Sequence, residues 1–226
     1  MERQHRHFED QLDAAYEKLL HLGGVVEEII GKSVRSLVDR DSDLAREVIR
    51  KDREIDQLEL ELDEACIELL ALHQPMARDL RFVTTAMKIT TDLERIGDHA
   101  VNIAERAIEL NEHPPLKPLI DIPLMAKTAQ EMVHGALDAF VHRDAAAARA
   151  VCAMDDLLDT RMEQVFRELM SYMAEDPHTI TRAMRLSFVA KYFERIGDQA
   201  TNICEQVVYM AEARVIKHGT DGGRQP

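Results

Sequence analysis

The chain has 226 residues, of which 46% are hydrophobic and 31% are charged, a composition typical of a soluble protein with one or two folded domains. Only 4% are aromatic, while leucine, alanine, glutamate, methionine and arginine abound, which favours helices over sheets. The net charge of −14 argues against a nucleic-acid-binding protein and against direct docking on an anionic membrane.

The sequence also indicates where the protein works. No stretch approaches the ~20 apolar residues that a membrane-spanning helix needs, and the first residues form no apolar signal region. We therefore expect a cytoplasmic protein without membrane insertion. Cys66, Cys152 and Cys204 are odd in number, far apart in sequence and never spaced as Cys-x-x-Cys. This pattern predicts buried, reduced thiols.

Turn signals divide the chain into six predicted helices. Asp41 and Ser42 can cap the second helix, Asp144 can cap the fifth, and Asp176-Pro177 can start the sixth. Three prolines within residues 113–118 separate two halves. The predicted helices cover approximately residues 8–38, 44–72 and 74–112, then the stretch from residue 118 to 141, and finally residues 144–173 and 176–215.

The two halves repeat one another. Residues 193–202 nearly copy residues 93–102, and residues 141–144 resemble residues 38–41. Such a repeat indicates a tandem duplication. We predict an all-α protein with two tandem antiparallel three-helix bundles. The expected limits are 1–113 for the first bundle, 114–217 for the second and 218–226 for a disordered tail.

The repeated stretch carries a polar stripe beside its buried face. At about 100° per residue, four polar positions of each copy gather within about 80° of the helix surface. Like charges four residues apart destabilise a helix by a few tenths of a kcal/mol, and a bound cation would remove that repulsion. Gly97 and Gly197, on the apolar side, predict a close approach of another helix. The stripe consists of Glu94, Asp98, Asn102 and Glu105, and of Glu194, Asp198, Asn202 and Glu205.

Two further helices carry acidic stripes that antiparallel packing could place opposite the first. All-oxygen ligand sets favour magnesium, manganese, calcium or iron ions over zinc. The asparagines and Glu105 and Glu205 are secondary candidates as ligands. The alternative, that these carboxylates form solvated faces, stays open because the chain has 42 acidic residues. The second set is Asp52, Asp56, Glu59 and Asp63 in one half, and Asp155, Asp159 and Glu163 in the other.

No phosphate-binding loop or nucleophilic catalytic set is present in the sequence, which favours a protein that is not an enzyme. A carboxylate-bridged metal oxidase or metal-storage bundle is the main alternative. Against it, a full set of paired Glu-x-x-His motifs is missing, since only Glu131-x-x-His134 and a pair at the amino terminus fit. A metal-free helical scaffold is the third possibility.

Several motifs together resemble the PhoU family of phosphate-uptake regulators. Glu-Arg-Ile-Gly-Asp followed by Asn-Ile occurs twice, at residues 94 and 194. Residues 74–81 (Gln-Pro-Met-Ala-Arg-Asp-Leu-Arg), 22–27 and 41–45 are also similar to that family. The resemblance covers roughly residues 8–215. The second half departs from it, because residues 175–180 (Glu-Asp-Pro-His-Thr-Ile) replace the Gln-Pro stretch.

The resemblance implies two similar three-helix bundles and multinuclear metal sites at Glu94/Asp98 and Glu194/Asp198. It also implies a homodimeric cytoplasmic adaptor that acts with the ATPase subunit of the phosphate ABC transporter and with the phosphate-sensing histidine kinase. Such a protein represses the phosphate-starvation response when phosphate is plentiful.

Overall fold

The computed structural model describes residues 2–215, with side chains from residue 7 onward. Within this part, every regular element is helical. The first half consists of α1 (Glu2–Val38), α2 (Ser42–His73) and α3 (Ala77–Asn111). The second half consists of α4 (Asp121–His142), α5 (Ala145–Cys152), α6 (Asp155–Glu175), the 3₁₀ turn η1 (Pro177–Thr179) and α7 (Ile180–Glu212).

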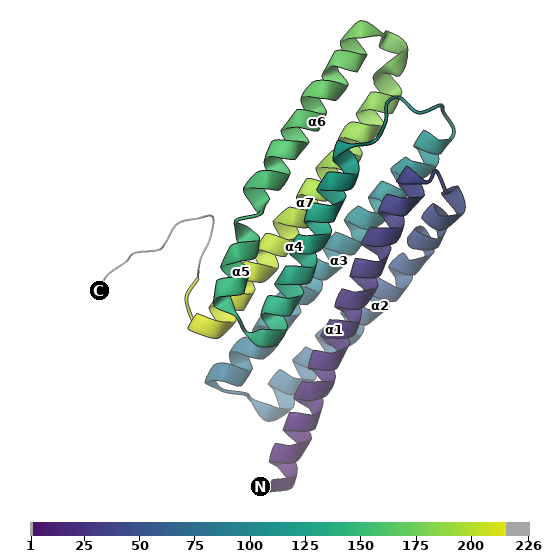
Figure 1. Ribbon diagram of the computed structural model, residues 1–226. Helices are drawn as coiled ribbons and strands as arrows, with labels where there is room; N and C mark the ends of the chain where they lie inside the picture. Colours follow the sequence, from purple (N-terminus) through teal and green to yellow (C-terminus); the bar gives the residue numbers. More distant parts are fainter. Residues whose placement is uncertain (1, 216–226) are drawn as a thin grey trace.

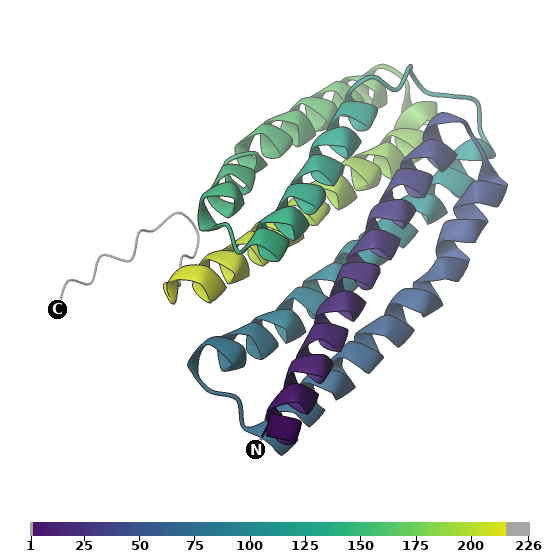
Figure 2. The same cartoon turned by 60° about the horizontal axis from the view of Figure 1, so that its bottom comes forward.

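The helices form two antiparallel three-helix bundles that lie side by side (Figure 1). In the first bundle α1, α2 and α3 pack on one another, and in the second α7 packs against α4, α5 and α6. The bundles meet mainly through α3 and α7, and also through α1 and α4 (Figure 2). The predicted fold class, an all-α tandem repeat of three-helix bundles, is confirmed.

One hydrophobic core runs through both bundles. Where they meet, the ring of Phe140 on α4 lies 5.9 Å from that of Phe82 and 5.7 Å from that of Tyr16. Polar contacts border this core: Arg185 Nε on α7 donates to Glu109 Oε2 on α3 at 2.6 Å. The two halves therefore share buried apolar surface, whose removal from water favours their association.

The same turn follows the first helix of each half. Arg40 and Arg143 adopt left-handed backbone, with φ of 57° and 52°. Asp41 and Asp144 then cap the next helix, because each carboxylate accepts hydrogen bonds from the backbone amides two and three residues ahead. The match between residues 38–41 and 141–144 in the sequence therefore encodes one repeated turn.

The fifth predicted helix is not continuous, so that prediction was wrong. Ala153 and Met154 interrupt it between α5 and α6, and the amide of Met154 bonds to the carbonyl three residues back, Val151, at 2.9 Å. Such i→i+3 bonds tighten a helix end and divert its axis. Neither glycine nor proline marks the break, and for this reason sequence punctuation did not reveal it. At the third helix, Gln74–Met76 form a loop before α3 starts at Ala77.

The proline-rich connection between the halves is anchored rather than loose. Lys117 is only 7% exposed, and its ammonium pairs with Glu168 on α6 and lies 3.8 Å from Asp121. The domain limits 1–113 and 114–217 stay a prediction. The predicted tail, 218–226, lies outside the described residues.

The cysteines are unpaired, as predicted, but two of them are not far apart in space. Cys66 and Cys204 are buried and Cys152 is half-buried. The thiols of Cys152 on α5 and Cys204 on α7 interact, which lowers the pKa of Cys152 and raises that of Cys204, an arrangement that sequence separation concealed. Among the described residues, no helix is both long and apolar enough to cross a membrane.

Candidate functional site

The acidic stripe of the first half lies where α2 and α3 pack together. Glu94 is half-buried and Asp98 is exposed, one helical turn apart on α3. Burial raises the pKa of Glu94 to about 7, with the Asp98, Glu59 and Asp56 carboxylates adding to the effect. Burial and then Asp56 raise the pKa of Asp98. Carboxylates from two helices therefore repel one another at one edge of the first bundle.

The α2 residues complete this cluster. Burial raises the pKa of Asp52, and the charges of Asp56, Asp98 and Glu105 raise it further. The pKa of Glu59 is raised in the same way, by burial and then by neighbouring acids that include Asp98. The structure thus places Asp52, Asp56, Glu94 and Asp98 close enough for their charges to act on one another, while their role as metal ligands stays a prediction.

The second half repeats the cluster between α6 and α7. Burial raises the pKa of Asp155 to about 6, and Asp198 is the strongest of the acidic neighbours that add to it. Asp159 raises the pKa of Glu194 and of Asp198, after burial in each case. The Oδ1 atom of Asp155 is buried without a hydrogen-bond partner. An uncompensated buried carboxylate oxygen is costly, so this atom is suited to a cation or water ligand.

The two glycines set the distance between the paired helices. A Cβ on Gly97 would lie 2.9 Å from Ile55 Cδ1 of α2, and one on Gly197 would lie 2.5 Å from Leu158 Cδ2 of α6. The latter Cβ would also approach Asp155 Oδ1 to 3.4 Å. Any larger residue would separate the helices that carry the opposing carboxylates. The close approach that the sequence predicted is confirmed.

The secondary candidates of the first half lie beside its cluster but have other partners, and Glu105 is near enough to raise the pKa of Asp52. Asn102 Nδ2 donates to the Asp98 carbonyl at 2.8 Å, and Glu105 pairs with Arg106 at 3.2 Å. Asn202 and Glu205 line a cavity between α3 and α7. Glu163, which shares the α6 stripe, is exposed and lies 4.0 Å from Arg167.

The two clusters supply oxygen donors, but their side chains are not gathered closely around one point. Among the described residues, no group of three or more His, Cys, Asp or Glu side chains is gathered closely enough to hold a metal ion. The donors in each cluster are carboxylates from two helices, which suits hard cations. The raised pKa values also favour a cation site, because a cation between the carboxylates would relieve the repulsion that contributes to these pKa values.

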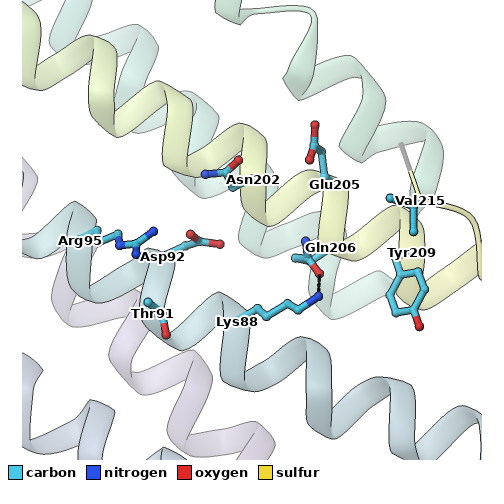
Figure 3. Close-up of a pocket in the computed structure, with 9 residues that line it drawn as sticks. All are labelled: Lys88, Thr91, Asp92, Arg95, Asn202, Glu205, Gln206, Tyr209 and Val215. Carbon is cyan, nitrogen blue, oxygen red and sulfur yellow. Dashed lines mark hydrogen bonds between the residues drawn. The ribbon is translucent and has the colours of Figure 1, made fainter. Parts of the chain in front are cut away.

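A cavity between the bundles was not predicted from the sequence. It has a volume of about 580 Å³ and lies between α3 and α7 (Figure 3). Asp92 is only 8% exposed there, and burial raises its pKa to about 6 against the lowering effect of Arg95 and Lys88. One signal was available: Asp92 stands where the other repeat has Tyr192. The cavity is lined by Lys88, Thr91, Asp92, Arg95, Asn202, Glu205, Gln206, Tyr209 and Val215.

Known proteins share both the sequence and the fold. A phosphate-specific transport system accessory protein PhoU homolog from Aquifex aeolicus (strain VF5) is 44% identical over 208 residues, which is 92% of this chain and 94% of that protein. The phosphate-specific transport system accessory protein PhoU of Escherichia coli (strain K12) is 35% identical over 213 residues, or 93% of this chain and 88% of that protein.

Two crystal structures agree with the fold. PhoU from Pseudomonas aeruginosa superposes with a TM-score of 0.89 at 39% identity, covering 92% of this chain and 100% of that one. The phosphate transport system regulatory protein PhoU from Streptococcus pneumoniae gives 0.87 at 29% identity, covering 93% and 100%. The PhoU domain model matches residues 19–107 and 122–207, once in each bundle. The chain therefore belongs to the PhoU family.

Proposed function

We propose that this chain is an accessory protein of phosphate uptake that binds metal ions and represses the phosphate-starvation response when phosphate is plentiful. The observation that carries the proposal is the PhoU domain match in both halves, in a chain whose acidic clusters recur in both. Relatives from several bacteria are accessory proteins of the phosphate-specific transport system. The role that we assign is regulatory rather than enzymatic.

The metal ions would be held by the paired carboxylates of each half. Glu94 and Asp98 would act with Asp52 and Asp56, and the equivalent acids of α6 and α7 would act in the second half. The buried, unpartnered Oδ1 of Asp155 and the mutually raised pKa values support this assignment. A bound hard cation supplies positive charge that neutralises the clusters and so ties α2 to α3 and α6 to α7.

The regulatory role would be carried out by binding. We assign the chain to the cytoplasm, as a homodimer that links the ATPase subunit of a phosphate ABC transporter to a phosphate-sensing histidine kinase. The net charge of −14 favours partner surfaces with complementary basic residues. Reversing exposed charges on the helices should therefore weaken both contacts.

Metal analysis tests the first part of the proposal. The double substitution Asp98→Ala and Asp198→Ala is expected to lower metal content, measured by elemental analysis of protein purified without an affinity tag. Helical circular dichroism should persist, because both side chains are partly exposed. The matched control removes two exposed acids of α2, Glu54→Ala and Glu68→Ala, and should keep its metal. Unchanged metal content in the Asp98/Asp198 variant would assign the clusters a structural role.

A deletion strain tests the regulatory part. Loss of the chain should switch on phosphate-scavenging genes in phosphate-rich medium, and the intact gene should restore repression. Pull-downs from phosphate-rich and phosphate-starved cells should recover the transporter ATPase and the kinase. Unaltered expression in a deletion strain that has no paralogue would overturn the regulatory role while leaving the metal assignment to its own test.

A further inference from the structure

The cavity between α3 and α7 contains two positive charges that no carboxylate neutralises by direct contact. Lys88 Nζ donates to the neutral amide oxygen of Gln206 at 3.2 Å and lies 5.9 Å from the centre of the Tyr209 ring. Arg95 forms no hydrogen bond or ion pair with another described residue, and its side chain extends toward Asp92 (Figure 3). The chain as a whole is acidic, with a net charge of −14, so two basic side chains without a carboxylate in direct contact are unusual in it.

The rest of the lining determines what the cations can bind. The oxygen of Gln206 accepts from Lys88, so its NH₂ group is left as a donor. Tyr209 offers a phenolic hydroxyl and an aromatic ring. Glu205 also lines the cavity; it points away from Lys88 and Arg95 in Figure 3, and its charge acts on Asp92 as well as on Cys152 of α5. The lining therefore presents two cations, neutral donors and two carboxylates, of which Asp92 lies between Lys88 and Arg95.

The equivalent place in the other repeat is occupied by protein. Tyr192 stands where Asp92 would be, and its ring lies 6.0 Å from that of His99. Arg106 pairs with Glu109 at 3.1 Å, and Glu109 also accepts from Arg185. The helices α3 and α7 thus pair through side chains at one end of their contact and leave a cavity at the other.

We propose that this cavity binds a small phosphate compound that also carries a hydroxyl group, with the phosphate between Lys88 and Arg95 and the hydroxyl donating to Asp92. Charge-assisted hydrogen bonds to lysine and arginine suit phosphate oxygens. An ionised carboxylate only accepts hydrogen bonds, so Asp92 favours a ligand with an O–H group and repels an anion without one. The volume of about 580 Å³ is that of a pocket for a small organic molecule.

Two sources share this chemistry: an organic phosphate ester with its own hydroxyls, and hydrogenphosphate with a P–OH group. Titration calorimetry on the full chain, freed of metal by chelation, distinguishes them with glycerol 3-phosphate, AMP and inorganic phosphate as probes. Sulfate, which has no proton to donate at neutral pH, is the comparison anion. We expect the tightest of the three phosphate probes to bind at least about tenfold more tightly than sulfate. The tightest probe then identifies the source.

Matched variants tie binding to the cavity. Arg95→Gln should weaken the tightest probe about tenfold or more, whereas Arg195→Gln, the same motif position in the other repeat, should leave its affinity unchanged. Asp92→Asn should reduce the preference for that probe over sulfate, a ratio that a purely structural role would not change. Circular dichroism checks that each variant is folded.

Three outcomes overturn the proposal: no heat of binding with any phosphate probe, sulfate affinity equal to that of the tightest probe, or equal losses from Arg95→Gln and Arg195→Gln. The proposal does not depend on the metal clusters, because the protein is metal-free in this test. Its failure is therefore distinguishable from failure of the metal or regulatory assignments.

Discussion

Some carboxylates of the acidic clusters destabilise the folded state when they are ionised, yet ionised carboxylates are what a cation would bind. Glu94 and Asp155 are held where burial and neighbouring acids disfavour their charged forms. The fold gains nothing from these charges when no cation is present. The residues are therefore better explained by what they bind than by what they stabilise, and pH is the simplest way to separate the two.

Metal-free protein should lose stability as the pH rises. Folding raises the pKa of Glu94 from 4.5 to about 7, so the folded state retains a proton that the unfolded chain releases between these values. The free energy of unfolding therefore falls across that window. Glu94→Gln should relieve the loss above about pH 7, by an amount on the order of 1 kcal/mol after solvent screening. Urea unfolding at several pH values measures it.

The control for this experiment is Glu64→Gln, an exposed acid of α2, which should follow the wild type at every pH. A Glu94→Gln curve parallel to the wild type would contradict the prediction. Adding the bound metal back should protect the wild type more than the variant at high pH.

The glycines give a second prediction at the residue scale. Gly197→Leu should destabilise the protein by about 1–3 kcal/mol, because overpacking forces Leu158 and its neighbours out of place. Gly97→Leu should act similarly, and both should cost more than Glu94→Ala. The control is Gly24→Ala, where nothing lies within 4 Å of the added Cβ. That change should stabilise α1 by up to about 1 kcal/mol. An unchanged urea midpoint for Gly197→Leu would show that α6 does not pack closely there.

At the scale of elements, the two halves use one turn in different ways. Arg40 donates to the carbonyls of Asn111 at 2.8 Å and His113 at 2.6 Å, which ties the turn to the end of α3. The side chain of Arg143, its counterpart, makes no hydrogen bond to another described residue, and only its backbone amide donates, to the end of α4. The left-handed backbone costs free energy at both arginines. Only at Arg40 do side-chain hydrogen bonds offset that cost.

The difference predicts opposite effects of one substitution. Arg143→Gly should be neutral or stabilising by up to about 1 kcal/mol, since glycine adopts positive φ without strain. Arg40→Gly should destabilise by about 1–2 kcal/mol, because the lost hydrogen bonds outweigh the relieved strain. Chemical denaturation of both variants gives the comparison. Equal shifts of the same sign would mean that the Arg40 contacts contribute nothing.

The elements also show what sequence can and cannot reveal. Helix existence followed from turn residues and apolar spacing, and the acidic clusters followed from helical periodicity combined with antiparallel packing. The break at Ala153 and Met154 left no local mark, because both residues are acceptable in helices. The contact between Cys152 and Cys204 depends on how α5 packs on α7, which local pattern does not specify.

For the whole molecule, the repeat predicted two bundles but not how they meet. The cavity arises from the pairing of α3 with α7, residues 88–95 facing residues 202–209. A sequence comparison of the repeats locates only the difference between Asp92 and Tyr192. It does not say that these positions face the other bundle, because that depends on the three-dimensional packing of the halves.

The paths of the chain ends have a consequence for connectivity. The chain enters α1 and leaves α7 at one end of the molecule, while the segment from α3 to α4 crosses the opposite end (Figures 1 and 2). A circular permutant opened between Pro115 and Leu116, with a flexible glycine–serine linker joining the old ends, would cut no helix. It should keep native helicity and a similar urea midpoint. The order of the two repeats along the chain would then be interchangeable, because the contacts between the bundles, and not the original connection, hold them in place.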